Sequence, residues 1–162
     1  MLQTEIQLDE AIAGVDEVGR GALFGPVVAA AVILPFAAIE PLTLAGVTDS
    51  KRLTPQRRMV LATQIQQIAV CRIGFASVRE IDRLNILQAS LLAMRRAIDR
   101  LDPVPSLCLI DGNQRVPGLA MPQQTIVKGD QQSLVIAAAS IVAKVWRDAL
   151  IDRLAAKYPQ YS

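Results

Sequence analysis

The sequence contains no histidine, only two cysteines and few aromatic residues. The absence of histidine excludes Ser-His-Asp catalysis, histidine general bases and most zinc or copper sites. Cys71 and Cys108 lie far apart and form no C-x-x-C pair, so neither a redox motif nor a zinc knuckle is indicated. We interpret both cysteines as small buried hydrophobic residues of a protein in a reducing compartment.

Long apolar runs are also absent. The most apolar windows, residues 26–38 and 134–143, are shorter than the roughly 20 residues that span a bilayer. The first residues carry acids where a secretory signal would need positive charge. We therefore expect a cytoplasmic protein with no membrane span. The net charge of +2 is too small to indicate a polyanionic partner, so any affinity for one must come from local clusters of charge.

The composition is that of a globular protein. Hydrophobic residues make up 52% and charged residues 20%, which excludes a disordered chain. A length of 162 residues suits one domain with a substantial core and is too short for two ordinary ones. We expect a single domain over residues 1–162.

Strand-like and helix-like segments alternate along the chain. Short apolar runs predict strands over residues 13–18, 26–34, 69–78, 107–110 and 124–127, the first two antiparallel and joined by a glycine-rich turn. Helices are predicted over three segments, namely 53–68 with Thr54 as N-cap and Leu61, Ile65 and Ile68 on one face, 85–101 with Leu87, Leu91, Met94, Ile98 and Leu101 on one face, and 131–157. This order predicts an α/β fold with a mixed sheet of about five strands flanked by helices.

Four acids fall at the ends of predicted strands. Asp16 and Glu17 lie in or after the first strand, Asp111 directly follows "LCLI", and Asp130 follows "QTIVKG". Ligand sites in open α/β sheets gather at strand ends, so we hypothesise that these acids converge. Structural alternatives remain: Asp130 as a helix N-cap, Asp111 as a turn residue, and the Asp16–Glu17 pair neutralised by Arg20.

Clustered carboxylates without histidine indicate a particular chemistry. Oxygen ligands select hard cations such as Mg²⁺ or Mn²⁺. Two such ions about 4 Å apart can activate water and stabilise the leaving oxygen of a phosphoryl transfer, so no side-chain base is required. The acids therefore favour a metal-dependent phosphodiesterase.

Six sequence blocks carry a family resemblance. "GVDEVGRGALFGPVVAAAVIL" resembles the opening signature of type 2 ribonucleases H, the bacterial ribonuclease HII family. The resemblance continues through "DSKRLTPQRR", "NILQASLLAMRRAI", "LIDGN", "IVKGD" and "IAAASIVAKVWRD", in family order from residue 14 to 148. It implies an RNase H-like fold. It also implies endonucleolytic cleavage of RNA in RNA/DNA hybrids, or on the 5′ side of ribonucleotides embedded in duplex DNA, leaving a 3′-hydroxyl and a 5′-phosphate.

The resemblance also assigns residues. It implies that Asp16, Glu17, Asp111 and Asp130 are the catalytic acids and bind two divalent ions, Mg²⁺ or Mn²⁺. It assigns Gly19, Arg20 and Gly21 to the ribonucleotide, because glycines allow backbone groups to approach the 2′-hydroxyl that distinguishes RNA from DNA. We expect a monomer whose partners are RNA/DNA hybrids and DNA duplexes containing ribonucleotides, with no membrane partner.

Further basic residues are candidates for contact with nucleic acid. Lys51 follows "DS" in a family-like block and is a phosphate candidate, whereas Arg57 and Arg58 are interpreted as a solvated helix start. Lys144 and Arg147 lie three residues apart on one helical face, which suits backbone phosphates. We interpret the single tryptophan, Trp146, as a packing residue.

One departure from the family pattern concerns the end of the sequence. Family members usually continue through a Lys-Gly-Tyr motif whose tyrosine is implied to stack on a sugar, and neither Tyr158 nor Tyr161 matches it. Two alternatives therefore stay open: another RNase H-like nuclease, such as a junction resolvase, and a nucleic-acid-binding protein that has lost turnover.

Overall fold

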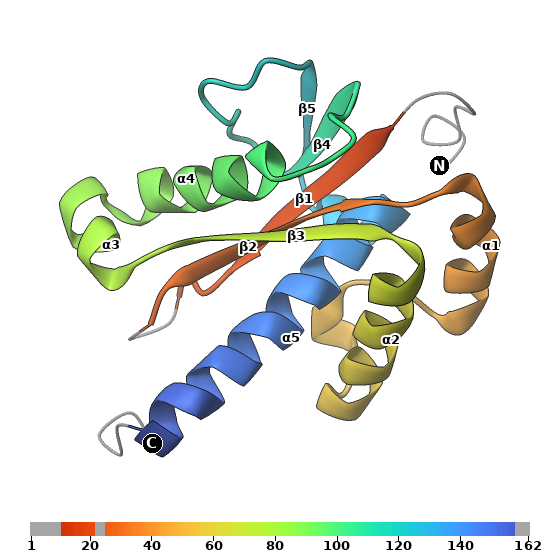
Figure 1. The fold of residues 1–162 in the computed structure, drawn as a ribbon, viewed down its shortest axis with the longest axis horizontal. Coiled ribbons are helices and arrows are strands. Elements are labelled where there is room, and N and C mark those ends of the chain that lie inside the picture. Colours follow the sequence, from red (N-terminus) through yellow and green to blue (C-terminus); the bar gives the residue numbers. More distant parts are fainter. Residues whose placement is uncertain (1–10, 22–24, 158–162) are drawn as a thin grey trace.

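A mixed sheet forms the centre of the computed structural model, which describes residues 11–21 and 25–157 (Figure 1). Within these residues the sheet has five strands in the order β3-β2-β1-β4-β5. Strand β1 pairs antiparallel with β2 and parallel with β4, and the predicted mixed sheet is confirmed. The strand bounds are β1 Ile12–Val18, β2 Val27–Ile33, β3 Val70–Ala76, β4 Leu107–Asp111 and β5 Gln123–Ile126.

The three predicted helices are present, with two more that the sequence did not indicate. The helices are α1 Phe36–Ala45, α2 Pro55–Ile68, α3 Val78–Leu84, α4 Ile86–Asp99 and α5 Leu134–Lys157, with short 3₁₀ turns η2 Ser50–Arg52 and η3 Gly129–Gln131. Thr54 caps α2 as predicted, because its hydroxyl accepts the Arg57 N–H. The last helix begins three residues later than predicted, so Asp130 belongs to η3 and is not the N-cap of α5.

Helices cover both faces of the sheet. Strand β2 is buried along its whole length, and its side chains alternate between two hydrophobic clusters as the period of a strand requires. Val28, Ala30 and Val32 face α5, which crosses one face diagonally beside α2 (Figure 1). Residues Ala29 and Ala31 face α4 on the other side. The sheet is therefore the middle layer of three.

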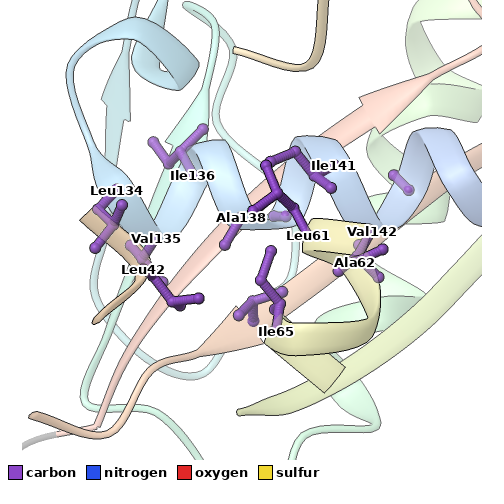
Figure 2. Packing of buried hydrophobic residues seen from close by; sticks show 14 of the residues in the cluster. Leu42, Leu61, Ala62, Ile65, Leu134, Val135, Ile136, Ala138, Ile141 and Val142 are labelled. Atoms are coloured by element: carbon purple, nitrogen blue, oxygen red, sulfur yellow. The ribbon is translucent and has the colours of Figure 1, made fainter. Parts of the chain in front are cut away.

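The packing of α2 against α5 fixes the position of α5 on the sheet. Leu61, Ala62 and Ile65 project from α2 toward Ile141 and Val142 of α5 (Figure 2). Fully burying each of the large aliphatic side chains contributes about 1.5–3 kcal/mol. Ile68, predicted on the same face as Leu61 and Ile65, is instead 43% exposed, because it lies in the last turn of α2.

Close contact between α5 and β1 depends on a missing side chain. A Cβ atom on Gly14 would clash with the backbone of Val135 and Ile136 in α5. Glycine therefore lets the first turns of α5 lie directly on β1, two residues from Asp16. Farther along α5, the Trp146 ring stacks on Phe75 of β3 with centroids 6.3 Å apart, which agrees with a packing role.

No helix in the described ranges is both long and apolar enough to cross a membrane. The predictions that concern the first ten residues and Tyr158 or Tyr161 fall outside the residues that the structure describes.

Arginines occupy the free edge of β3. Arg96 of α4 and Arg100, which caps the end of α4, donate hydrogen bonds to the carbonyl oxygens of Phe75 and Ile73, at 2.9 and 2.7 Å. Arg96 also pairs with both carboxylate oxygens of Glu80, which completes a capping box with Ser77 at the start of α3. These contacts satisfy outward-facing strand carbonyls that would otherwise be open to another strand.

The first prediction concerns Glu80 on this edge. Hydrogen bonds from Arg96 and from the Ser77 amide lower the pKa of Glu80 to about 2, so its contribution to stability is present above about pH 4.5 and is lost as the pH falls toward 2. We expect Glu80→Gln to reduce the free energy of unfolding at pH 7 by about 1 kcal/mol, in urea titrations. The difference from the unsubstituted protein should shrink as the pH falls from 4.5. Asp99→Asn, in the exposed Arg95–Asp99 pair, is the control and should change little. A pH-independent difference would contradict the ion pair.

Candidate active site

Parallel pairing of β1 with β4 places two acids side by side. Val15 lies opposite Ile110 in this register, so the next residues, Asp16 and Asp111, are neighbours where β4 ends. Their carboxyl groups lie within hydrogen-bonding reach of each other, and Asp16 is only 5% exposed. The sequence hypothesis that strand ends bring these acids together therefore agrees with the geometry.

Glu17 and Asp130 lie in the same cleft as Asp16 and Asp111. Glu17 follows Asp16 in the part of β1 that extends beyond the paired region of β4. Asp130 reaches the site through a tight turn after β5, in which Lys128 adopts a left-handed conformation, and the Asp130 N–H donates to Asp111 Oδ1 at 3.4 Å. All four acids line one cleft of about 430 Å³.

Burial beside other carboxylates raises the pKa values of acids in this cleft. Burial, and then the charges of Asp111 and Glu17, raise the pKa of Asp16 well above its usual value. Burial also raises the pKa of Glu17 to about 7, although Arg20 and Lys51 act in the opposite direction. The pKa of Asp130 is raised by burial and by Asp111 and Asp49. Burial and neighbouring carboxylates therefore disfavour the charged forms of Asp16, Glu17 and Asp130.

A hard cation fits this set of side chains in its chemistry. Every candidate ligand is a carboxylate, and a divalent ion would supply the charge that buried carboxylates need. Within residues 11–21 and 25–157, no three acidic or cysteine side chains are arranged so that they could hold an ion as they stand. The carboxylates would therefore have to turn toward a bound ion.

Asp49 is a fifth acid at the site, which the sequence analysis missed. It is 3% exposed, caps η2 by accepting the Lys51 N–H at 3.0 Å, and hydrogen-bonds to Asp130. In the sequence, "TDSKR" has the composition of a solvated turn, because its polar residues give no sign of long-range burial. The only available signal was the position of Asp49 inside the family-like block that contains Lys51.

The η2 turn, which carries Lys51, is held from two helices. Ser50 Oγ hydrogen-bonds to Ser140 Oγ of α5 at 2.8 Å, in a buried position. Arg58 of α2 donates to the carbonyl oxygens of Ser50 and Leu53, at 2.9 and 2.8 Å. The interpretation of Arg58 as part of a solvated helix start is therefore wrong, since it is half-buried and lines the cleft; Arg57 is exposed as expected.

The glycine turn, residues 19–21, lines the cleft through Gly19 and Arg20, whereas Gly21 is not among the lining residues. Gly19 has a φ of +100°, which favours glycine, whereas a Cβ atom on Gly21 would meet nothing within 4 Å. Arg20 is 45% exposed, and its Nη1 lies 4.0 Å from Glu17 Oε1. The distance and exposure show that this pair only weakly neutralises Glu17.

The two predicted basic residues of α5 differ in their surroundings. Lys144 lines the cleft with a half-exposed side chain and pairs with Asp148 at 3.0 Å. Arg147 is 9% exposed and donates from Nε to the carbonyl oxygen of Pro26 at 2.9 Å. The shared helical face that the sequence indicated is present, but its two charges lie at different depths.

Comparison with known proteins identifies the family. The family model described as Ribonuclease HII matches residues 13–161. The chain belongs to the ribonuclease HII family. It is 68% identical over 153 residues to the ribonuclease HII of Acaryochloris marina, covering 94% of this chain and 77% of the relative. For the ribonuclease HII of Trichodesmium erythraeum the identity is 67% over 150 residues, covering 92% and 71%.

A solved structure agrees with this assignment. The PCNA:RNase HII complex from Archaeoglobus fulgidus contains a chain that is 30% identical, with a TM-score of 0.79 over 91% of this chain and 78% of that one. The predicted RNase H-like fold is thereby confirmed, and the protein is a type 2 ribonuclease H, an endonuclease.

The second prediction concerns the ionisation of Glu17 in metal-free protein. A carboxyl group whose pKa is raised on folding costs stability as the pH rises from its unfolded value, about 4.5, to its folded value, about 7. We expect the protein in EDTA to lose stability over this range, and Glu17→Gln to reduce the loss by at most about 3 kcal/mol.

Chemical denaturation between pH 4.5 and 7.5 measures this loss, with Asp152→Asn on the exposed side of α5 as control. Millimolar Mg²⁺ should flatten the pH dependence of the unsubstituted protein. Equal slopes for Glu17→Gln and the unsubstituted protein would show that Glu17 ionises normally.

Proposed function

We propose that this ribonuclease hydrolyses the RNA strand of RNA/DNA hybrids and the bond on the 5′ side of a ribonucleotide embedded in duplex DNA. The products are a 3′-hydroxyl and a 5′-phosphate. The observation that carries this proposal is one cleft whose lining includes the four carboxylates together with Gly19 and Arg20. Acids suited to a hard cation thus share a cleft with part of the glycine turn.

Asp16, Glu17, Asp111 and Asp130 are the proposed holders of two divalent ions, Mg²⁺ or Mn²⁺. When bound, such ions activate a water for attack and stabilise the leaving oxygen of the phosphodiester. The acids contribute position and negative charge. Asp16 and Asp111, on neighbouring strands, are fixed by the sheet, whereas Asp130 depends on the turn between β5 and α5.

The basic residues hold the nucleic acid. Arg20 and Lys51 lie close enough to Glu17 to influence its pKa, so they flank the acids at the cleft. Lys144 lines the same cleft from α5. We assign these three side chains to substrate phosphates, where their positive charge orients the strand without reading its sequence.

The thiols support a cytoplasmic location. Burial raises the pKa of Cys71 to about 11 and that of Cys108 to about 12, so neither thiol ionises readily at neutral pH. Both cysteines are free. We therefore propose that the enzyme works in a reducing compartment and needs no disulfide.

The third prediction tests the proposed reaction. A duplex with one embedded ribonucleotide should be cut on its 5′ side in Mg²⁺ or Mn²⁺, whereas an all-DNA duplex and a DNA four-way junction should stay intact. Asp16→Asn and Asp111→Asn should each reduce the cleavage rate at least about 100-fold, because each removes a proposed ligand charge while preserving shape. Circular dichroism should show an unchanged fold. Cleavage of the junction, or full activity in both variants, would overturn the proposal.

The fourth prediction tests how the sugar is recognised. Gly21 has open space around its α-carbon and no left-handed conformation, so Gly21→Ala should leave folding unchanged. The added methyl group should obstruct a sugar at the cleft and reduce cleavage of the ribonucleotide-containing duplex by about 10-fold or more, in line with the steep dependence of rate on substrate position.

The comparison variant is Gly46→Ala, after α1. Gly46 also has nothing within 4 Å, although its φ of +92° adds backbone strain, so thermal unfolding should be recorded for both variants. Wild-type kinetics in Gly21→Ala would mean that the sugar does not approach this turn.

A further inference from the structure

We propose that Arg147 is a positioning residue for the glycine turn. In this role its side chain packs against the backbone at Gly19 and holds it in place. The spacing from Lys144 along the helix suggested instead a contact with a substrate phosphate, which this inference replaces. This inference rests on the proposed function, since it concerns the turn to which we assign recognition of the ribonucleotide.

The location of Arg147 supports a structural contact with the β1–β2 connection. Its side chain is 9% exposed, and its Nε donates to the Pro26 carbonyl oxygen at 2.9 Å. Pro26 directly precedes β2, 121 residues away in the chain. A guanidinium keeps its charge and its planar fork of donors even when buried, so it can hold backbone carbonyls where a lysine would provide a single flexible donor.

Two glycines at this connection are shaped around the Arg147 side chain. A Cβ atom on Gly19 would lie 2.5 Å from Arg147 Nε, and one on Gly25 would lie 3.1 Å from Arg147 Nη2. Both glycines also have positive φ values, +100° and +88°. The guanidinium therefore fills the space that side chains would occupy, and contacts the connection both before and after residues 22–24.

The lining of the cleft separates Arg147 from the phosphate candidates. Arg20, Lys51 and Lys144 line the cleft that contains the acids, and Arg147 is not among its lining residues. Arg147 instead lines a neighbouring cavity of about 350 Å³ between α2 and α5. A phosphate bound in front of the acids would thus meet Lys144 first.

Helix α5 links the position of Arg147 to the geometry of the proposed reaction. Ser140, Lys144 and Arg147 are spaced i, i+4 and i+7, which places them along one face of the helix. Ser140 holds the η2 turn through Ser50, and Arg147 holds the glycine turn. One rigid helix therefore sets the distance between the two loops that flank the acids, and a small shift of one loop would misplace the substrate.

Two substitutions at Arg147 and one control test the inference. Arg147→Met removes the charge and the donors, Arg147→Lys retains the charge, and Arg153→Met changes an exposed arginine of the same helix. The readouts are kcat and KM on a duplex with one embedded ribonucleotide, the salt dependence of duplex binding, and amide hydrogen exchange at residues 19–21.

We expect kcat to fall about 10- to 100-fold in Arg147→Met, because rate depends steeply on substrate position, while KM changes less than about 3-fold. Amide exchange at residues 19–21 should accelerate at least about 10-fold, because the turn loses its support. Arg147→Lys should show a smaller defect of the same kind, and Arg153→Met none. The slope of binding against salt should stay unchanged in all three.

Other outcomes overturn the inference. A salt slope reduced by about one, with unchanged amide exchange and full rescue by lysine, would show that Arg147 contacts a phosphate. Unchanged kcat and exchange in both variants would show that the turn does not need Arg147. If Arg147→Met fails to fold, the same measurements on Arg147→Lys decide whether the turn needs Arg147. If the unsubstituted protein cuts no ribonucleotide-containing duplex, the proposed function fails, while amide exchange still decides whether Arg147 supports the turn.

Discussion

The parallel pairing of β1 with β4 is the constraint on which the active site depends. It brings Asp16 and Asp111 together from positions 95 residues apart, at the point where β4 ends and β1 continues. Because β1 lies in the middle of the sheet, with helices on both faces, Asp16 is buried as well as crowded. The fold therefore creates an unfavourable concentration of negative charge, and only a cation or protons can relieve it. In the proposed function, a bound divalent ion would both supply the chemistry and relieve this repulsion.

A second feature of the site is the position of cationic side chains around the acids. The sheet positions the backbone of Asp16, Glu17 and Asp111, and four cationic side chains line the same cleft, namely Arg20, Lys51, Arg58 and Lys144. Cations built into the core beside Asp16 would neutralise the acids permanently and compete with a metal. Cations that line the cleft leave the carboxylates available for an ion and are placed to meet the phosphates of the proposed substrate.

Parts of this organisation could be predicted from the sequence, for identifiable reasons. Strand β2 is a short continuous apolar run, helix α4 has a strong helical period, and Thr54-Pro55 marks a helix start by local chemistry alone. Helix α1 was missed because Pro41 argues against a helix, although Ala38 and Leu42 bury themselves in the core. The role of Asp49 depends on its contact with the distant Asp130, and that of Arg58 on how α2 folds back on the η2 turn, and no local pattern encodes either. The four acids could be proposed from strand ends, but their assignment as a set came from the family resemblance.

The extent to which a residue on one helical face is buried could not be predicted from the local sequence pattern. Lys144 and Arg147 have the spacing of two neighbouring phosphate contacts, yet one side chain is exposed at the cleft and the other is buried beneath a turn. The difference arises because Gly19, Gly25 and Pro26 lie against Arg147, and the two glycines leave room for a guanidinium. The two glycines of the turn therefore have different surroundings. Gly21 has open space beside its α-carbon, whereas Gly19 leaves room for the Arg147 side chain. A glycine-rich motif that indicates substrate approach in the sequence can therefore also mark the site where the protein's own side chain packs against the backbone.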